Sequence, residues 1–189
     1  MNTIVITGAS SGIGEATARH FQANGWNVIA TMRDPSKANG LSDLDKVLVT
    51  RLDVTDAASI PAAVAAGIDR FGKIDVLLNN AGLVNNERRV TEDGFEETLA
   101  VNHLAPFLLT GLLIPALSEN ARVVNVSSEA HAMVKGMGFE DMQAEQSYRT
   151  FREYGRSKLA NILFTRSLAQ RLQDTTVTVN ALHPGAVST

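Results

Sequence analysis

Short apolar runs rich in β-branched residues alternate along this chain with longer segments whose apolar positions recur at helical spacing. The first run ends at a glycine, and Asn24-Gly25 is typical of a helix C-terminus. The pattern predicts strands over Thr3–Thr7, Asn27–Met32, Val47–Leu52, Ile74–Leu78, Ala121–Val126 and Thr176–Leu182. It predicts helices over Gly14–Ala23, Ala57–Phe71 and Thr150–Gln173, and one long or kinked helix within Asp93–Leu117.

Strands that alternate with helices in this way favour parallel βαβ units. The predicted strands are almost wholly apolar, as expected where helices cover both faces of a sheet. We therefore expect an α/β fold, a Rossmann-type doubly wound parallel sheet in three layers, with residues 1–189 as a single domain. Asp56 is the expected N-cap of the second helix. The segment 128–147 shows neither pattern, and irregular segments of this length are often functional.

Charge and composition exclude several functional classes. The 17 Lys and Arg and 20 Asp and Glu residues give a formal net charge of -3, which gives no support for nucleic-acid binding. The chain has no cysteine, which excludes disulfides, thiol nucleophiles and thiolate metal sites and fits a cytoplasmic protein. No cluster of His, Asp and Glu indicates a metal site, and the N-terminus lacks the pattern of a signal peptide.

The most apolar long run is Val101–Leu117, which Asn102, His103 and two prolines interrupt. It is shorter than the roughly 20 residues that a bilayer-spanning helix needs. We therefore expect a buried helix here and no membrane span.

A glycine-rich turn follows the first predicted strand and precedes the first helix. It reads Thr7-Gly8-Ala9-Ser10-Ser11-Gly12-Ile13-Gly14. Glycine lets the backbone turn sharply and approach a ligand, and the N–H groups of a helix N-terminus attract phosphate. The spacing G-x-x-x-G-x-G differs from the G-x-G-x-x-G of the common dinucleotide fingerprint. A tight turn without a ligand is the alternative, but its place after an N-terminal strand favours a pyrophosphate site.

The end of the second predicted strand bears on the choice of dinucleotide. An acidic residue there is expected to bind the adenosine ribose of NAD, but Met32 occupies that position and Arg33 follows it. The planar guanidinium of an arginine pairs well with the 2′-phosphate of NADP. Arg33 therefore favours NADP, while Asp34 beside it leaves NAD as the alternative.

Tyr154 and Lys158 lie four residues apart on the last predicted helix, so both side chains point to one face. A nearby ammonium favours the phenolate and lowers the pKa of a tyrosine from about 10. Such a tyrosine can act as an acid or base near neutral pH. Tyr148 is the rival tyrosine, but Arg152 takes the place of the lysine there.

Further short motifs follow the predicted strands in order. They are Asn79-Asn80-Ala81-Gly82, Asn102 in the apolar run, Ser127-Ser128 and Pro184-Gly185. Together with the glycine turn and the Tyr154/Lys158 pair, they resemble the ordered motifs of the short-chain dehydrogenase/reductase family over essentially the whole chain. Within that family, the sequence over 101–104 and 157–164 looks most like the retinol-dehydrogenase-like reductases.

The resemblance implies a catalytic set of Asn102, Ser128, Tyr154 and Lys158. It implies that Tyr154 exchanges a proton with the substrate oxygen and that Ser128 hydrogen-bonds this oxygen. Lys158 would lower the tyrosine pKa and bind the nicotinamide ribose, and Asn102 would hold a water that links Lys158 to solvent. Ser127 is the alternative to Ser128, because strand alternation lets only one of them face the site. A helix kink near the following proline is the alternative role for Asn102.

The resemblance also implies a nicotinamide cofactor that carries the hydride. Asp53 would contact the adenine, and Thr189 would reach the nicotinamide amide. Together with Arg33, the expected cofactor-binding residues are Gly8, Ser10, Ser11, Gly12, Ile13, Gly14, Asp53, Val54, Asn80, Ala81, Gly82, Tyr154, Lys158, Pro184, Gly185 and Thr189.

We expect an oxidoreductase that transfers hydride between NADP(H) and a small-molecule carbonyl or secondary alcohol. A non-catalytic nucleotide-sensing or interaction module that retains the cleft is the alternative function. From the resemblance we also expect a homo-oligomer, either a dimer or a tetramer. Family members continue past the position of Thr189 with a substrate-covering loop, a helix and a strand, so we expect the sheet to lack that last strand.

Overall fold

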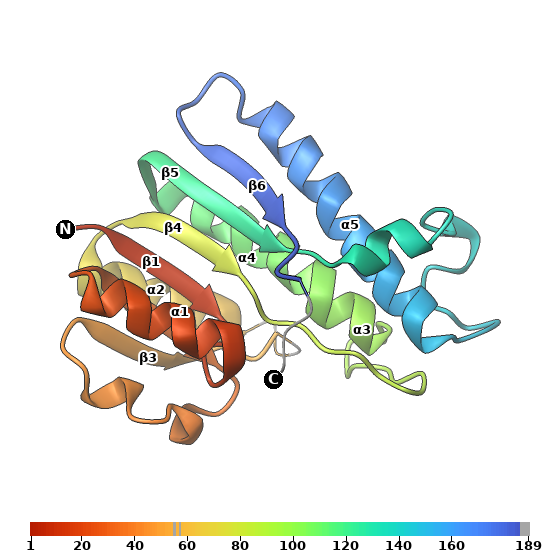
Figure 1. Cartoon of the computed structure of the whole chain (residues 1–189), viewed down its shortest axis with the longest axis horizontal. Helices are drawn as coiled ribbons and strands as arrows, with labels where there is room; N and C mark the ends of the chain where they lie inside the picture. The colour runs from red at the N-terminus through yellow and green to blue at the C-terminus, as the bar shows by residue number, and fades with distance from the viewer. Residues whose placement is uncertain (55, 57, 186–189) are drawn as a thin grey trace.

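The computed structural model describes residues 1–54, 56 and 58–185, which form one parallel sheet of six strands in the order β3-β2-β1-β4-β5-β6 (Figure 1). The strands are β1 Thr3–Thr7, β2 Asn27–Met32, β3 Val47–Arg51, β4 Ile74–Asn79, β5 Leu117–Val126 and β6 Thr178–Leu182. Each corresponds to a predicted strand, and β5 differs most because it begins at Leu117. The Rossmann-type sheet predicted from the sequence is confirmed.

The order of the strands creates a switch point beside β1. Val5 of β1 is paired with Ile29 of β2 on one side and with Leu77 of β4 on the other. The chain builds outward from β1 to β3, then returns and builds outward from β4 to β6. In a doubly wound sheet, ligands bind at the carboxyl ends of the strands where this reversal occurs. The segments that follow Thr7 and Asn79 therefore flank the expected crevice.

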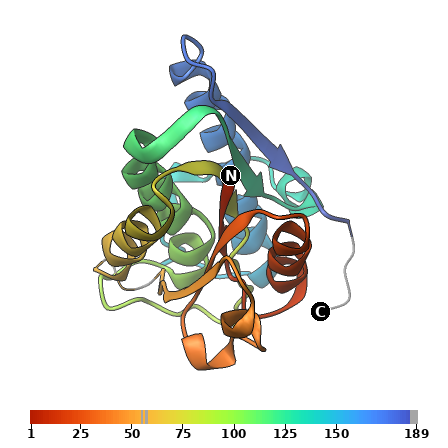
Figure 2. The ribbon, with the colours of Figure 1, turned by 90° about the vertical axis from the view of Figure 1, so that its left-hand side faces the viewer.

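Helices cover both faces of the sheet, which confirms the predicted three layers. They are α1 Gly12–Ala23, α2 Ser59–Phe71, α3 Glu97–Leu99, α4 Ala105–Leu113 and α5 Thr150–Arg171. One core cluster includes Ala18 of α1, and the other includes Ile60 of α2, Leu109 of α4 and Leu168 of α5. Figure 2 shows α1 on one side of the sheet and α2 and α4 on the other. That the chain forms a single domain stays a prediction.

The helical stretch predicted within Asp93–Leu117 runs from Glu97 to Ala116 and is interrupted, as the prediction of a long or kinked helix allows. Its first turn starts at Glu97 because the carboxylate of Glu96 accepts hydrogen bonds from the N–H groups of Thr98 and Leu99, over 2.9 and 2.7 Å. A π-helical turn over Ala100–Leu104 separates α3 from α4, and a 3₁₀ turn over Ile114–Ala116 leads into β5.

Helix α2 begins later than predicted. It starts at Ser59 with Ala58 as its N-cap, while Ala57 lies outside the described residues. The carboxylate of Asp56 accepts a hydrogen bond from the Ala58 N–H over 3.1 Å, and its carbonyl accepts one from the Ser59 N–H over 3.0 Å. The prediction of Asp56 as the N-cap is therefore wrong, because it stabilises the turn just before the helix.

The segment 128–147 is irregular, as predicted, and packs against α5. It contains the 3₁₀ turns Glu129–Met133 and Phe139–Asp141. Arg156 of α5 donates to the carbonyls of Met137 and Gly138 and forms a buried ion pair with Glu153 over 2.8 Å. This arginine ties the irregular segment to the helix that carries Tyr154 and Lys158.

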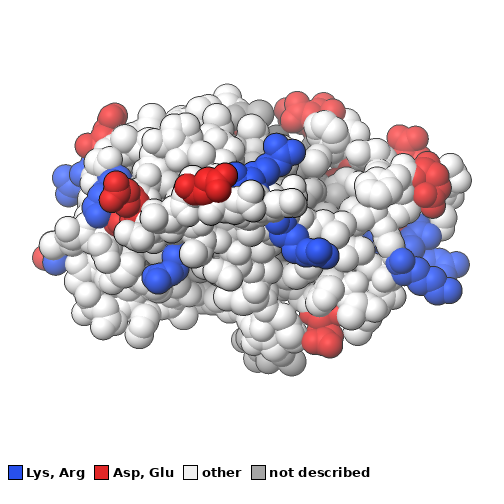
Figure 3. All heavy atoms as spheres, turned by 90° about the horizontal axis from the view of Figure 1, so that it is seen from above, with Lys and Arg blue, Asp and Glu red and all other residues white. Residues whose placement is uncertain are grey.

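One helical stretch among the described residues, Glu97–Ala116, is long and apolar enough to cross a membrane by length and composition alone, with a mean hydropathy of 1.6. Half of its most apolar window is buried. Leu109 and Leu113 of this stretch lie in the core, which is the position expected of a buried helix. The face drawn in Figure 3 carries positive and negative side chains interspersed among uncharged ones.

Candidate active site

The glycine turn connects β1 to α1 in the conformation that only glycine adopts easily. Gly8 and Gly12 have φ angles of +68° and +55°. A β-carbon on Gly14 would overlap the carbonyl oxygen of Gly8 and lie 2.8 Å from the side-chain nitrogen of Asn80. Ser11 precedes α1 in an extended conformation, and its side chain makes no capping hydrogen bond. The N–H groups of the first turn of α1 are therefore available to an anionic ligand.

A cavity of about 430 Å³ opens beside this turn, and we call it the first cavity. Ten of the expected cofactor-binding residues line it: Gly8, Ser10, Ser11, Gly12, Ile13, Arg33, Val54, Asn80, Ala81 and Gly82. The other lining residues are Thr7, Met32, Leu52, Leu83, Glu97 and Val101. A glycine-lined cavity at an uncapped helix N-terminus has the shape and the donors that a dinucleotide pyrophosphate needs. The residues present thus fit such a cofactor.

Thr7 organises the floor of the first cavity, a role that we did not predict. Its hydroxyl accepts hydrogen bonds from the N–H groups of Asn80 and Ala81, each over 2.9 Å. The side chain of Asn80 donates back to the carbonyl of Thr7 over 2.9 Å. These bonds fix the segment after β4 against the glycine turn. The hydroxyl residue at the head of the glycine motif was the available signal.

The side chains of the adjacent residues Arg33 and Asp34 have different surroundings. Arg33 is exposed and lines the first cavity together with Met32. The carboxylate of Asp34 instead accepts hydrogen bonds from the N–H and hydroxyl of Ser36, over 3.0 and 2.6 Å, and caps a 3₁₀ turn. These bonds hold the pKa of the Asp34 carboxyl below its usual value. Arg33 therefore lines the cavity, whereas the carboxylate of Asp34 is occupied by its hydrogen bonds to Ser36.

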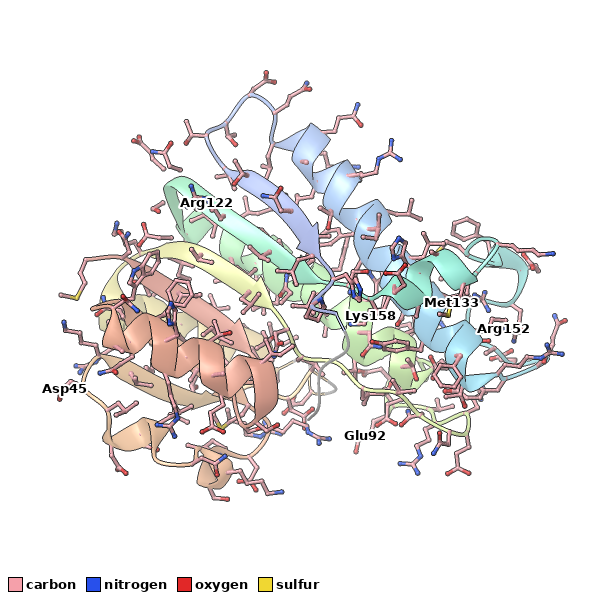
Figure 4. The ribbon with its side chains drawn as sticks, viewed as in Figure 1. Asp45, Glu92, Arg122, Met133, Arg152 and Lys158 are labelled. Carbon is pink, nitrogen blue, oxygen red and sulfur yellow. The ribbon has the colours of Figure 1, made fainter. Side chains whose placement is uncertain are left out.

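Tyr154 and Lys158 lie together on α5, as the spacing predicts. The ammonium of Lys158 lies 5.6 Å from the centre of the Tyr154 ring and donates to the carbonyl of Val126 over 3.1 Å. Lys158 is 4% exposed, and burial lowers its pKa from the ordinary value of 10.5 to about 8. Figure 4 shows Lys158 beside the carboxyl ends of β5 and β6.

Both residues line a second cavity of about 210 Å³. It is lined by Ile13, Asn80, Gly82, Leu83, Val84, Val126, Ser127, Ser128, Tyr154, Lys158, His183, Pro184 and Gly185. Four residues, Ile13, Asn80, Gly82 and Leu83, line both cavities. The two cavities therefore share a wall at the switch point of the sheet.

The two serines after β5 have different surroundings. The hydroxyl of Ser127 is buried and donates to the backbone carbonyl of Lys158 over 2.9 Å. The hydroxyl of Ser128 is half-buried and accepts a hydrogen bond from the N–H of Ala130 over 3.3 Å. A hydroxyl that accepts in this way still has its own proton to donate. Ser128 can therefore donate into the second cavity, whereas the Ser127 proton is engaged by the backbone.

Asn102 is fully buried and holds the segment that follows β4. Its side-chain nitrogen donates to the carbonyl of Leu83 over 2.9 Å and to the hydroxyl of Ser157 over 3.0 Å. Its side-chain oxygen accepts from the N–H of Leu83 over 2.8 Å. Ser157 in turn donates to the carbonyl of Tyr154 over 2.7 Å. Asn102 thus joins Leu83 to α5, and the water-holding role implied by the resemblance stays a prediction.

Residues 2–189 match the model of the family described as short chain dehydrogenase. The chain belongs to the short-chain dehydrogenase family. It is similar to Retinol dehydrogenase 12 of Mus musculus, with 45% identity over 97% of this chain and 61% of that protein. It is similar to Retinol dehydrogenase 14 of Homo sapiens, with 42% identity over 99% of this chain and 62% of that protein. The chain thus spans about three fifths of the length of these relatives.

Solved structures of the short-chain dehydrogenase fold superpose closely. An uncharacterized protein from Mycobacterium paratuberculosis has 39% identity and a TM-score of 0.88 over all of this chain and 70% of its own. A blue fluorescent protein from a metagenomic library, solved with NADPH, has 28% identity and a TM-score of 0.82, over 100% of this chain and 75% of its own. A short chain dehydrogenase from Burkholderia cenocepacia, solved with NADP, has 27% identity and a TM-score of 0.83, over 99% of this chain and 75% of its own. The predicted family resemblance, retinol-dehydrogenase-like, is confirmed.

In this short-chain dehydrogenase, Tyr148, His131 and His183 each contact other polar groups, although His183 also lines the second cavity. The Tyr148 hydroxyl donates to the carbonyl of Asn85 over 2.9 Å, and burial raises its pKa. The imidazole of His131 lies 2.6 Å from the carbonyl of Ser128, and that of His183 lies 3.2 Å from the Glu129 carboxylate. Among the described residues, no group of three or more His, Asp or Glu side chains could hold a metal ion.

Two of the expected cofactor-binding residues, Gly14 and Asp53, line neither cavity. Gly14 supports the turn by close packing and lines neither cavity. Asp53 also lines neither; its carboxylate lies 3.6 Å from the Arg51 guanidinium, and its N–H donates to the Ser59 hydroxyl over 2.9 Å. Thr189 lies outside the described residues.

Proposed function

We propose that the chain transfers hydride between NADP(H) and an apolar carbonyl compound or the corresponding alcohol, with Tyr154 as the acid and base. The wall that the two cavities share carries this proposal. A dinucleotide whose pyrophosphate lies at the glycine turn would extend past Gly82 into the cavity that contains Tyr154, Lys158 and Ser128. Reaction partners would therefore meet beside the phenol.

The residues of the first cavity would hold the cofactor. The N–H groups after Ser11 would bind the pyrophosphate, and the segment Asn80–Gly82 would lie along the ribose and nicotinamide. When bound, the nicotinamide supplies the hydride for carbonyl reduction and accepts it in alcohol oxidation. The Lys158 ammonium would donate a hydrogen bond to the nicotinamide ribose.

Two side chains would contact the substrate oxygen, and Lys158 would act on it through Tyr154. In reduction, the Tyr154 hydroxyl donates its proton to the carbonyl oxygen as negative charge develops there; in oxidation the phenolate takes the proton back. The Lys158 ammonium favours the phenolate by its charge. Ser128 donates a hydrogen bond to the same oxygen and stabilises the developing charge.

Three observations support NADP over NAD. Arg33 lines the first cavity, where its guanidinium can pair with a 2′-phosphate. Met32 stands where an acid would bind the ribose of NAD, and Asp34 is engaged by Ser36. Two structural neighbours were solved with NADP or NADPH.

The names of the relatives support an apolar substrate, since both relatives described above are retinol dehydrogenases. We therefore propose retinal-like aldehydes and other apolar carbonyl compounds as the first substrates to test. The cytoplasmic location and the homo-oligomer stay predictions.

The test is NADPH oxidation by the purified protein with a panel of apolar aldehydes and ketones that includes retinal, run beside an NADPH binding titration. We expect saturable binding and turnover of at least one carbonyl compound. Saturable NADPH binding without turnover of any carbonyl compound or oxidation of any alcohol would instead favour the nucleotide-sensing module.

A further inference from the structure

A proline leaves one carbonyl of the predicted catalytic set without its helical donor. Pro106 lies four residues after Asn102 and has no N–H, so it cannot donate to the Asn102 carbonyl as the residue at that position does in an α-helix. The π-helical turn over Ala100–Leu104 stands just before this proline. The Asn102 carbonyl instead accepts a hydrogen bond of 2.9 Å from the side-chain amide of Asn161 on α5.

The other end of the Asn161 amide faces a histidine. Its side-chain oxygen lies 3.0 Å from Nδ1 of His103. Because this oxygen can only accept, Nδ1 of His103 must carry the proton. Burial lowers the pKa of His103, which favours the neutral ring, and the rings of Phe107 and Phe164 lie 6.4 and 6.1 Å from it. The network therefore assigns His103 as the neutral Nδ1–H tautomer.

These bonds continue to the residues around Lys158. Asn161 follows Lys158 by three residues on α5 and is 3% exposed. The side chain of Asn102 clamps both backbone groups of Leu83. A β-carbon on Gly82 would lie 3.3 Å from the side-chain oxygen of Asn102 and 3.3 Å from the Lys158 ammonium. One chain of contacts thus links His103 through Asn161 and Asn102 to the wall beside Lys158.

We propose that Asn161 is a positioning residue of the active site, and that His103 as the Nδ1–H tautomer orients its amide. The Asn161 amide replaces the N–H donor that Pro106 lacks. It therefore fixes the position of the turn that carries Asn102 relative to Lys158 and Tyr154. The inference rests on the proposed function, because the relative positions of these side chains affect turnover only if they act on a substrate. Small displacements of reacting groups cost large factors in rate.

The first test is Asn161→Asp, which keeps the size of the side chain and replaces the donating nitrogen with an oxygen. Two oxygens would then face each other at the Asn102 carbonyl. We expect kcat for NADPH-dependent carbonyl reduction to fall about tenfold or more. The KM for NADPH should change less than about twofold, since the glycine turn that binds the pyrophosphate is untouched. Rates are expressed per NADPH-binding site, so that misfolded protein does not enter kcat.

The matched control is Asn180→Asp on β6, where the side chain is exposed. It makes the same chemical change and should leave kcat and KM as in the wild type. A second variant, His103→Phe, removes the donor to Asn161 within apolar surroundings. It should also lower kcat. The double variant with Asn161→Asp should lose little further kcat, because both substitutions break the same hydrogen-bond network. Should Asn161→Asp fail to fold, His103→Phe decides the proposal by itself.

The imidazole nitrogen resonances of His103 give a readout that a general packing role would not move. We expect the Nδ1–H tautomer in the wild type, and the Nε2–H tautomer would overturn the proposal. If the wild type shows turnover that requires Tyr154, and Asn161→Asp leaves this turnover unchanged, the positioning role is refuted and the proposed function is not. Wild-type protein without Tyr154-dependent turnover would refute the proposed function.

Discussion

The Ser127 hydroxyl donates to the backbone carbonyl of Lys158 over 2.9 Å and so joins the end of β5 to α5. The residue next to it, Ser128, keeps its hydroxyl proton for the second cavity. The two adjacent serines therefore have separable roles, one in holding the helix and the other in contacting the substrate oxygen.

Alanine at each serine should separate these roles. Ser128→Ala should lower kcat about 100-fold, the cost of losing one donor to a developing oxyanion, and barely change stability. Ser127→Ala removes a buried hydrogen bond to a carbonyl that keeps its helical donor, and should cost about 0.5–1.5 kcal/mol in urea unfolding. Steady-state rates and urea curves for both variants measure this, and the reverse assignment of the two effects would contradict the proposed roles.

Replacing Lys158 should stabilise the cofactor-free protein at neutral pH while abolishing turnover. Its pKa is about 8 in the folded state and 10.5 ordinarily, so below pH 8 both states hold the proton and the fold bears the full cost of burying the ammonium. That cost is roughly 3 kcal/mol. Between about pH 8 and 10.5 the unfolded chain holds more protons, so wild-type stability rises with pH.

Lys158→Met removes this cost. In urea unfolding it should be more stable than the wild type by about 1–3 kcal/mol at pH 7, and this advantage should shrink towards pH 10. An equal loss of stability at both pH values would show that the buried ammonium does not strain the fold.

Arg33→Ala tests the cofactor preference. Losing a charge-assisted contact to the 2′-phosphate should raise the Kd for NADPH about tenfold to a hundredfold and leave that for NADH within about twofold. Arg166→Ala, an exposed arginine on α5, is the control and should change neither. Fluorescence titration with both nucleotides measures the ratio, and an unchanged ratio would remove the case for NADP.

Two glycine substitutions should have opposite effects. Gly14→Ala would place a methyl group against the Gly8 carbonyl, so we expect a loss of about 1–3 kcal/mol or more and much weaker NADPH binding. Gly111→Ala in α4 meets nothing within 4 Å and should stabilise the helix by up to about 1 kcal/mol. Thermal unfolding with and without NADPH checks both, and a well-tolerated Gly14→Ala would contradict the close-packed turn.

The strands and the order of the layers could be predicted because each strand is a nearly continuous apolar run with a glycine or polar residue at its end. Local chemistry also located Tyr154 relative to Lys158, since their spacing alone puts them on one helical face. Element ends were harder, because they depend on capping bonds. Nothing in the apolar pattern indicates where within Asp93–Leu117 the helical stretch begins, because the N-cap Glu96 decides this.

The partners of Asn102 could not be predicted, for a different reason. Asn161 lies 59 residues from Asn102 in the sequence and reaches it only because the π-helical turn over Ala100–Leu104 packs against α5. Thr7 likewise reaches Ala81 across 74 residues through the pairing of β1 with β4. Sequence motifs identify the residues that line the site. The residues that hold them in position are identified only by the packing of the helices and strands.

The proposed mechanism depends most on the proton that Tyr154 exchanges with the substrate. The direct measurement compares Tyr154→Phe with Tyr148→Phe, the other tyrosine of the chain, in NADPH-dependent carbonyl reduction and in NADPH binding. We predict that Tyr154→Phe lowers kcat by about 100-fold to 10,000-fold with the Kd for NADPH within about twofold, while Tyr148→Phe stays near the wild type. Wild-type turnover in Tyr154→Phe would contradict the proposed mechanism.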